Sequence, residues 1–239
     1  MSKNKSLSFL LSFFIIACLL VSQQLFAQPQ QTAVPVEQEP HHAIVFENKN
    51  VRIYDSLIPP GEATLFHTHS FDSVSVAVSG GMGRNELQGM PPTPFSGLPA
   101  GWVAFSKATN APYTHRLTNT GATPLRFVTA EILSSSASPG VPAVLNTVPG
   151  HELVLQNDRV TVYRILVDPK QSTGTRSRTL PWLRISVSQS TISVQRPGKS
   201  PEILDAKPGD YRCYEGPTTD SIENVGSTKY EAIEIELKK

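Results

Sequence analysis

Residues 61–80 read GEATLFHTHSFDSVSVAVSG, and the interpretation of the whole chain depends on this stretch. His67 and His69 lie near its middle, one residue apart, between a Pro-Pro-Gly turn and Gly80. Side chains two residues apart on a β-strand point to the same face and are roughly 6 to 7 Å apart. Imidazole groups suit zinc, iron, copper and nickel. The stretch therefore predicts a strand that presents two histidines to one metal ion.

Short segments rich in Val, Ile, Phe and Thr follow one another from Ile44 onward, separated by Gly, Pro and Asn. Such segments are typical of β-strands, and no segment of comparable length carries a helical apolar stripe. The expected strands cover residues 51–58, 74–78, 102–105, 115–119 and 125–132. Residues 81–101 are rich in Gly and Pro, and we interpret them as a long connection. The pattern predicts an all-β chain.

The amino terminus has the order of a secretory signal peptide. Lys3 and Lys5 precede an apolar run over residues 7–21, and the polar stretch that follows ends at Ala27. This order predicts cleavage near Ala27 and export to the periplasm or the medium. The unbroken apolar run is shorter than the roughly 20 residues that span a bilayer, so we expect no stable membrane insertion after cleavage.

Charge and cysteine content exclude several classes of protein. Removing the two signal lysines from 21 basic residues leaves 19, against 20 acidic residues. This near-neutral balance gives no reason to expect nucleic acid or an anionic membrane as a partner. Cys213 is the one cysteine left after the signal, so an apolar core must stabilise the exported chain without an internal disulfide.

The chain contains an internal repeat. Residues 48–61, NKNVRIYDSLIPPG, align without a gap with residues 157–170, NDRVTVYRILVDPK, at an offset of 109 residues. At the same offset Val78 corresponds to Val187, and after a small deletion residues 127–132 correspond to residues 232–237. Similarity at this length predicts a duplicated β unit, and hence two small barrels or sandwiches.

The first half of the repeat resembles the cupins. Gly61, five residues, His67-Thr68-His69 and the later Gly80 resemble the first cupin motif, G-x5-H-x-H-x3/4-E-x6-G. The second cupin motif ends in H-x3-N, which His115 and Asn119 match. The resemblance covers residues 44–133 and extends through the repeat to residues 155–238. It implies a bicupin, an all-β chain with two jelly-roll-like cupin β-barrels in tandem.

The resemblance also implies a metal centre. His67, His69 and His115 are similar to the three cupin histidines that hold a divalent metal, which we expect to be Fe(II), with Mn, Ni, Zn or Cu as alternatives. We expect Asn119 to be structural. The glutamate of the motif falls on Ser73, which is no ligand, and Asp72 faces away by strand alternation. A three-histidine site resembles the thiol dioxygenase branch of the cupins.

The second half carries different residues at the same positions. Arg176 and Arg178 correspond to the first two histidines, and Asp220 corresponds to His115. Guanidinium groups do not coordinate cations, so we expect no metal in this copy. One interpretation is a decayed repeat in which the arginines are solvated or paired to acids. The other is an anion pocket, because arginine presents a planar fork to carboxylates.

These observations predict five segments: a signal peptide (1–27), a flexible leader (28–42), a metal-binding cupin domain (43–133), a linker (134–150) and a degenerate second cupin domain (151–239). We expect His41 and His42 in the leader, and His151 beyond the linker, to be solvated. The predicted function is an exported, metal-dependent enzyme, dioxygenase-like, whose partner is a small organic substrate. The alternative is a non-catalytic cupin that binds a small ligand or metal. Catalytic residues beyond the ligands are not assigned, and a homodimer is left open.

Overall fold

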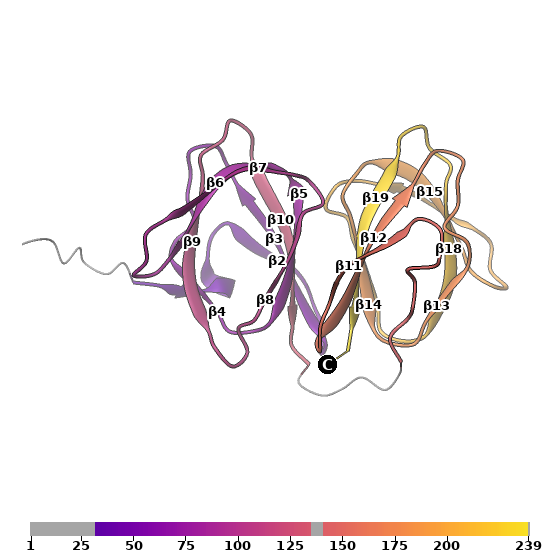
Figure 1. Cartoon of the computed structure of the whole chain (residues 1–239), viewed down its shortest axis with the longest axis horizontal. Helices are drawn as coiled ribbons and strands as arrows, with labels where there is room; N and C mark the ends of the chain where they lie inside the picture. The colour runs from indigo at the N-terminus through magenta and orange to yellow at the C-terminus, as the bar shows by residue number, and fades with distance from the viewer. Residues whose placement is uncertain (1–31, 135–140, 239) are drawn as a thin grey trace, which may run out of the picture. The chain divides into compact units, whose positions relative to one another are not determined.

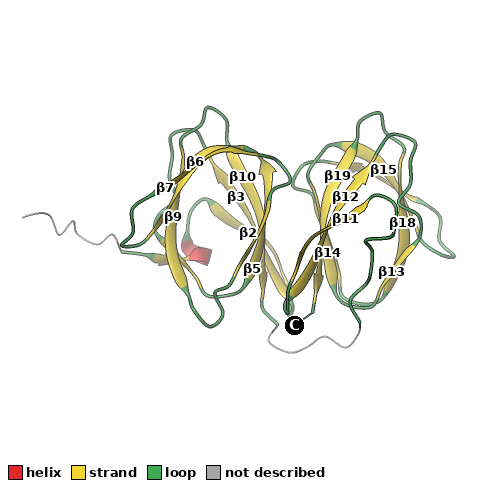
Figure 2. Ribbon diagram, in the orientation of Figure 1, coloured by secondary structure: helices red, strands yellow, loops and turns green. Residues whose placement is uncertain are grey.

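The computed structural model describes residues 32–134 and 141–238. These residues form β-strands joined by loops, with one short 3-10 helix, η1 (Val36–Gln38) (Figure 2). The predicted all-β class is confirmed. The predicted signal peptide lies outside the described residues, as do residues 28–31 of the leader and 135–140 of the linker. Within the described ranges there is no helix with the length and hydrophobicity that a bilayer crossing requires.

Ten strands form the first barrel (Figure 1). They are β1 (Val34–Pro35), β2 (His42–Glu47), β3 (Val51–Ile58), β4 (His67–His69), β5 (Ser73–Ser79), β6 (Gly81–Leu87), β7 (Thr93–Leu98), β8 (Val103–Ser106), β9 (Tyr113–Asn119) and β10 (Leu125–Ile132). They make two five-stranded sheets in the orders β1-β4-β9-β6-β7 and β2-β3-β10-β5-β8. Neighbouring strands that are distant in sequence, such as β3 and β10, are typical of a jelly roll.

Nine strands form the second barrel, drawn in orange to yellow in Figure 1. They are β11 (His151–Gln156), β12 (Val160–Val167), β13 (Arg176–Arg178), β14 (Trp182–Ser186), β15 (Ser190–Gln195), β16 (Glu202–Ala206), β17 (Tyr211–Tyr214), β18 (Thr218–Asn224) and β19 (Tyr230–Leu237). Their sheets have the orders β11-β12-β19-β14-β17 and β13-β18-β15-β16.

The two barrels repeat the same topology. Each strand of the second barrel takes the place of the strand nine numbers earlier in the first, and only β1 has no counterpart. The registers also agree: His67 lies opposite His115 on β4 and β9, and Arg176 lies opposite Asp220 on β13 and β18. The sequence repeat is therefore a structural repeat.

One apolar core lies between the barrels. Val51 and Ile53 on β3 belong to the same buried cluster as Val160 and Val162 on β12, whereas Ser56 faces the interior of the first barrel. Successive side chains of a strand point to opposite faces, so these central strands are buried on both sides. This double burial explains why apolar residues occupy positions on both faces of these strands.

Two segments differ from expectation. The leader is ordered from Val34 onward: β1 pairs in parallel with β4, η1 follows, and Val36 and Glu39 are buried. Residues 81–101, expected as a connection, contain the hairpin of β6 and β7. The residues of β7 are mostly exposed, so this edge strand lacks the apolar alternation that predicts a strand.

Candidate metal centre

The structure brings the three predicted histidines together inside the first barrel. His67 and His69 lie on β4, and the ladder between β4 and β9 places His115 opposite His67. The ring centroid of His67 is 4.5 Å from that of His115 and 5.0 Å from that of His69. The rings of His69 and His115 are 5.1 Å apart. Their role as metal ligands remains a prediction.

Hydrogen bonds fix which nitrogen of each ring is available. The Nδ1 atom of His67 lies 3.0 Å from the Leu65 carbonyl oxygen, and Nδ1 of His115 lies 2.7 Å from Oδ1 of Asn85. Because both partners accept hydrogen bonds, each Nδ1 carries the proton and each Nε2 keeps a lone pair. Nε2 of His67 is buried without a hydrogen-bond partner, and the Nε2 atoms of His69 and His115 are 3.2 Å apart.

A fourth histidine joins this group. His42 begins β2, and its ring centroid is 4.6 Å from that of His67. One ligand nitrogen from each of His42, His67 and His69 lies within 4.8 Å of the others. The expectation that His42 is solvated is therefore wrong. One signal was present in the sequence: the offset of 109 residues aligns His42 with His151, so both repeats carry a histidine here.

Glu39 orients His42. The Nδ1 atom of His42 donates to Oε2 of Glu39 at 2.5 Å, and the backbone N–H of Leu65 donates to Oε1 at 3.1 Å. Burial alone would raise the pKa of Glu39, but hydrogen bonds from His42, Leu65 and His41 outweigh it and hold the pKa at about 2. Glu39 is therefore a buried carboxylate that holds the imidazole of His42 with Nε2 free.

His67 and His115 are uncharged near neutral pH. Burial lowers the pKa of His67 to about 3, with a further contribution from His42. Burial, together with the neighbouring histidines, lowers the pKa of His115 to about 2. Neutral imidazole is the form that binds metals.

A carboxylate lies across the sheet from the place where the cupin motif has its glutamate. Ser73 is buried there, and Glu131 on β10 is its direct cross-strand partner. Oε1 of Glu131 has no hydrogen-bond partner and lies 3.8 Å from Nδ1 of His69, behind that ring. Asp72 faces away, as predicted: it accepts hydrogen bonds from the backbone N–H groups of Ala108 and Thr109.

A cavity of about 430 Å³ opens onto the histidines. The side chains that line it are His42, Ser56, Ile58, His67, His69, Ser75, Asn85, Phe95, Leu98, Trp102, Ala104, Ser106, Tyr113, His115, Leu117, Phe127 and Thr129. The ring of Tyr113 stacks on that of His69 at 5.1 Å. The site is thus a histidine cluster at the wall of a ligand-sized space.

The histidine cluster fits a divalent transition metal. Metal–nitrogen bonds of roughly 2.0 to 2.1 Å bring two ligand nitrogens to about 2.9 to 3.4 Å from one another. The 3.2 Å separation between Nε2 of His69 and Nε2 of His115 agrees with this range. The buried Nε2 of His67 lacks any other partner among the described residues, and imidazole donors suit iron, zinc, copper and nickel.

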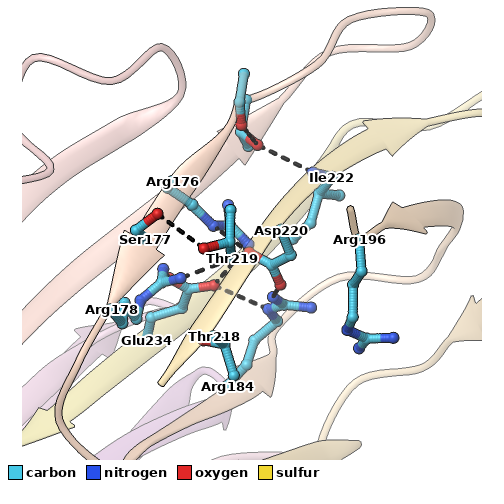
Figure 3. Close-up of polar contacts among 12 residues, drawn as sticks. Arg176, Ser177, Arg178, Arg184, Arg196, Thr218, Thr219, Asp220, Ile222 and Glu234 are labelled. Carbon is cyan, nitrogen blue, oxygen red and sulfur yellow. Dashed lines mark hydrogen bonds and ion pairs between the residues drawn. The ribbon is translucent and has the colours of Figure 1, made fainter. Parts of the chain in front are cut away.

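The equivalent place in the second barrel holds a cluster of charged side chains (Figure 3). Nε of Arg176 donates to Oδ1 of Asp220 at 3.0 Å, and Nε of Arg184 donates to Oε1 of Glu234 at 2.9 Å. Arg178 also donates to Glu234, and all five side chains are buried. The arginines are therefore paired to acids, as one of the two interpretations predicted.

His151 belongs to this cluster, and the expectation that it is solvated is wrong. Its side chain is buried, and its Nε2 accepts a hydrogen bond from Nη1 of Arg176 at 3.2 Å. Its Nδ1 lies 3.1 Å from the Pro149 carbonyl oxygen. Burial, with the charge of Arg176, lowers the pKa of His151 to about 3, so the ring is neutral.

Comparisons with known proteins agree at the level of the fold. No protein-family model and no curated protein matches the sequence. AerE from Microcystis aeruginosa is 13% identical, with a TM-score of 0.64, over 87% of this chain and 98% of that chain. Salicylate 1,2-dioxygenase from Pseudoaminobacter salicylatoxidans, in adducts with gentisate, is 11% identical, with a TM-score of 0.55, over 99% and 91%.

A variant of oxalate decarboxylase from Bacillus subtilis is also similar, at 10% identity and a TM-score of 0.58, over 82% of this chain and 72% of that chain. Identities this low establish the fold and not the activity. The solved structures are cupin-fold proteins, and two of the names above belong to enzymes that act on small acids. The chain therefore has the cupin fold, in the tandem arrangement of a bicupin, as the sequence motifs predicted.

Proposed function

We propose that this protein is a metal-dependent cupin enzyme of the dioxygenase type that acts on a small organic molecule. The observation that carries the proposal is the convergence of four histidines, with Nε2 of His67 buried and unpartnered, at the wall of a 430 Å³ cavity. The names of similar structures, among them a dioxygenase and a decarboxylase, support this class of chemistry.

Each residue has a defined part in the proposal. His67, His69 and His115 hold the metal, and His42 adds a fourth imidazole on the same side as His67. A divalent metal held there, with Fe(II) as our first choice, supplies Lewis-acid and oxygen-activating chemistry. Leu65, Asn85 and Glu39 fix the ring orientations through the Nδ1 atoms. The apolar part of the cavity wall excludes water from the bound substrate.

A second candidate function is a binding protein without turnover. The observation that favours it is Ser73, because the carboxylate ligand of the cupin motif is absent from β5. Under this alternative the histidines hold a metal or the cavity holds a small ligand, and no reaction follows.

Export is the remaining part of the proposal. Lys3, Lys5 and the apolar run over residues 7–21 support it, together with the cleavage position near Ala27. Expression of the full chain with amino-terminal sequencing of the periplasmic and medium fractions tests it. We expect a mature chain that begins at Gln28, and an intact amino terminus that stays in the cytoplasm would contradict export.

Metal analysis of the mature protein, purified without added metal, tests the central claim. We expect about one divalent ion per chain in the wild type, and loss of most of it in His115→Ala. His151→Gln is the matched control, because it removes a buried histidine from the second barrel and should leave the metal content unchanged. Substoichiometric metal in the wild type would overturn the proposal. Oxygen uptake with phenols and thiols, lost in His115→Ala, separates the enzyme from the binding protein.

A further inference from the structure

The wall of the cavity in the first barrel is largely apolar. Away from the histidines, its large apolar side chains include those of Phe95, Leu98, Trp102, Leu117 and Phe127, which come from three strands and one loop. Side chains of this kind favour the burial of a hydrophobic body, and the aromatic ones offer faces on which a planar ring can stack. The bulk of the ligand should therefore be apolar.

The remaining polar groups of the wall are neutral. They are the hydroxyls of Ser56, Ser75, Ser106, Tyr113 and Thr129 and the amide of Asn85. Oγ of Ser56 is buried without a hydrogen-bond partner, whereas the hydroxyls of Ser75 and Thr129 bond to each other at 3.0 Å. The polar part of the wall therefore offers neutral hydrogen-bonding groups to the hydroxyl groups of a ligand.

No lysine or arginine is among the described residues that line the cavity. Arg84, on β6, is exposed and outside the wall, and Arg126 is paired with Asp55. The second barrel shows the contrast, because the counterparts of Ser75 and Thr129 there are Arg184 and Glu234. An organic carboxylate that entered the first barrel would lose its hydration without a cationic side chain to replace it.

The size of the cavity limits the ligand further. A cavity of about 150 Å³ lined by apolar side chains holds one benzene molecule. The cavity here, at about 430 Å³, has close to three times that volume. A molecule with one or two rings fits this space and still reaches the histidines.

We propose that the cavity takes a neutral aromatic or alicyclic molecule of one or two rings that carries hydroxyl groups, and that it discriminates against organic carboxylates. This substrate class rests on the metal-dependent function proposed above, since the ligand would lie against the histidines. The proposed ligand is neutral, whereas the similar structures have salicylate, gentisate and oxalate in their names, which are all carboxylates.

Calorimetric titration with naphthol and with naphthoate, a neutral and an anionic probe with the same ring system, tests the proposal. The full mature protein is titrated near pH 7, both stripped of metal and loaded with zinc, which is redox-inactive. We expect naphthol to bind at least about tenfold more tightly than naphthoate in both states. Trp102→Arg, which places a cation at the partly exposed edge of the wall, should reduce this preference at least about tenfold, while Trp102→Gln should not.

Three outcomes would overturn the substrate class: equal binding of the two probes, failure of both to bind, or tighter binding of naphthoate in the zinc-loaded protein. In the last case the metal, and not the wall, would select the ligand. If the protein holds no metal and still prefers naphthol, the proposed function fails while the inference about the wall stands.

Discussion

The two barrels place different chemistry on the same scaffold. His67, His69 and His115 of the first barrel occupy the positions that Arg176, Arg178 and Asp220 occupy in the second, and the strand registers are the same. His42 and His151 also correspond in position, and each lies at the start of its strand. At these positions the barrels therefore differ in side chains and not in strand register.

The difference lies in what the side chains at these positions contact. In the second barrel each of three guanidinium groups meets a carboxylate of Asp220 or Glu234, as Figure 3 shows. In the first barrel the Nε2 atom of His67 has no partner, and a cavity opens beside it. Two arginine nitrogens of the second barrel also lack a hydrogen bond, but each lies within 3.6 Å of a carboxylate oxygen of Glu234 or Asp220. The comparison supports a structural role for the arginine cluster and agrees with the binding role proposed for the histidines.

The largest effect should come from breaking the arginine cluster. Asp220→Asn removes one of the two carboxylates that pair with Arg176 and Arg184, and leaves three buried guanidinium groups with Glu234 alone. Breaking a buried pair in this way costs about 3 to 5 kcal/mol. Urea unfolding of the metal-free protein should show a loss of this size.

The matched control for Asp220→Asn is Glu202→Gln, at the partly exposed pair of Glu202 with Arg196. An exposed pair contributes about 0 to 1 kcal/mol, so this variant should be close to the wild type. If Asp220→Asn were as mild as Glu202→Gln, the cluster would have no structural role.

Substitution of a first-barrel histidine should have a smaller effect on stability, and this effect should depend on whether metal is present. Zinc at about 100 times its dissociation constant should stabilise the wild type by about 2.7 kcal/mol, because it binds the folded state only. His67→Ala should lose this gain, and in EDTA it should be less stable than the wild type, because a buried ring and its Nδ1–H donor to Leu65 are removed. Thermal unfolding with zinc and with EDTA measures both quantities. An equal stabilisation of His67→Ala by zinc would contradict the assignment of His67 as a ligand.

The barrels should respond alike where their side chains are the same. Asn119 and Asn224 each donate to two backbone carbonyl groups and accept from one backbone N–H, at distances of 2.7 to 3.0 Å. Asn119→Ala and Asn224→Ala should each cost about 2 kcal/mol, because buried carbonyl groups lose their donors. Urea unfolding measures both losses of stability, and the loss in Asn224→Ala should be the larger one, because Asn224 also accepts a hydrogen bond from Oγ of Ser190. A smaller loss in Asn224→Ala than in Asn119→Ala would contradict this.

Local spacing predicted the parts of the site that lie on one strand or within one motif. His67 and His69 share a face because they are two residues apart, and the H-x3-N ending identified His115. His42, Glu39 and Glu131 were not predicted, because their contacts depend on how distant strands pair. Glu131, for example, reaches His69 only because the register of β5 and β10 sets it opposite Ser73. No local pattern in the sequence carries that information.

The same limit explains the errors at the edges of the first barrel. The leader, residues 28–42, is rich in Gln and Pro, yet the backbone N–H of Val34 bonds to the Phe66 carbonyl oxygen and the side chain of Glu39 is buried. A segment of this composition predicts disorder when its partners are unknown. Here the partner is β4, the strand that carries the histidine pair. The sequence does not show that the leader packs against this strand. The leader was therefore expected to be flexible, and His42 at its end was expected to be solvated.

The smallest expected effect concerns the histidine position that both barrels share, and it is seen in the pH dependence of stability. The folded-state pKa of His151 is about 3, below the ordinary value of 6.5, because of burial and the charge of Arg176. As the pH falls below about 6.5 the unfolded chain takes up this proton and the folded chain does not, so stability declines until about pH 3. His151→Gln keeps an acceptor for Arg176 but does not titrate. Between about pH 6 and pH 5 the free energy of unfolding of the wild type should fall by about 1 kcal/mol more than that of this variant.

Urea unfolding at the two pH values measures this difference for His151. The contributions of the first-barrel histidines cancel, because both proteins contain them. Equal losses would mean that His151 is protonated in the folded state, and the neutral ring assigned to the second barrel would then be wrong.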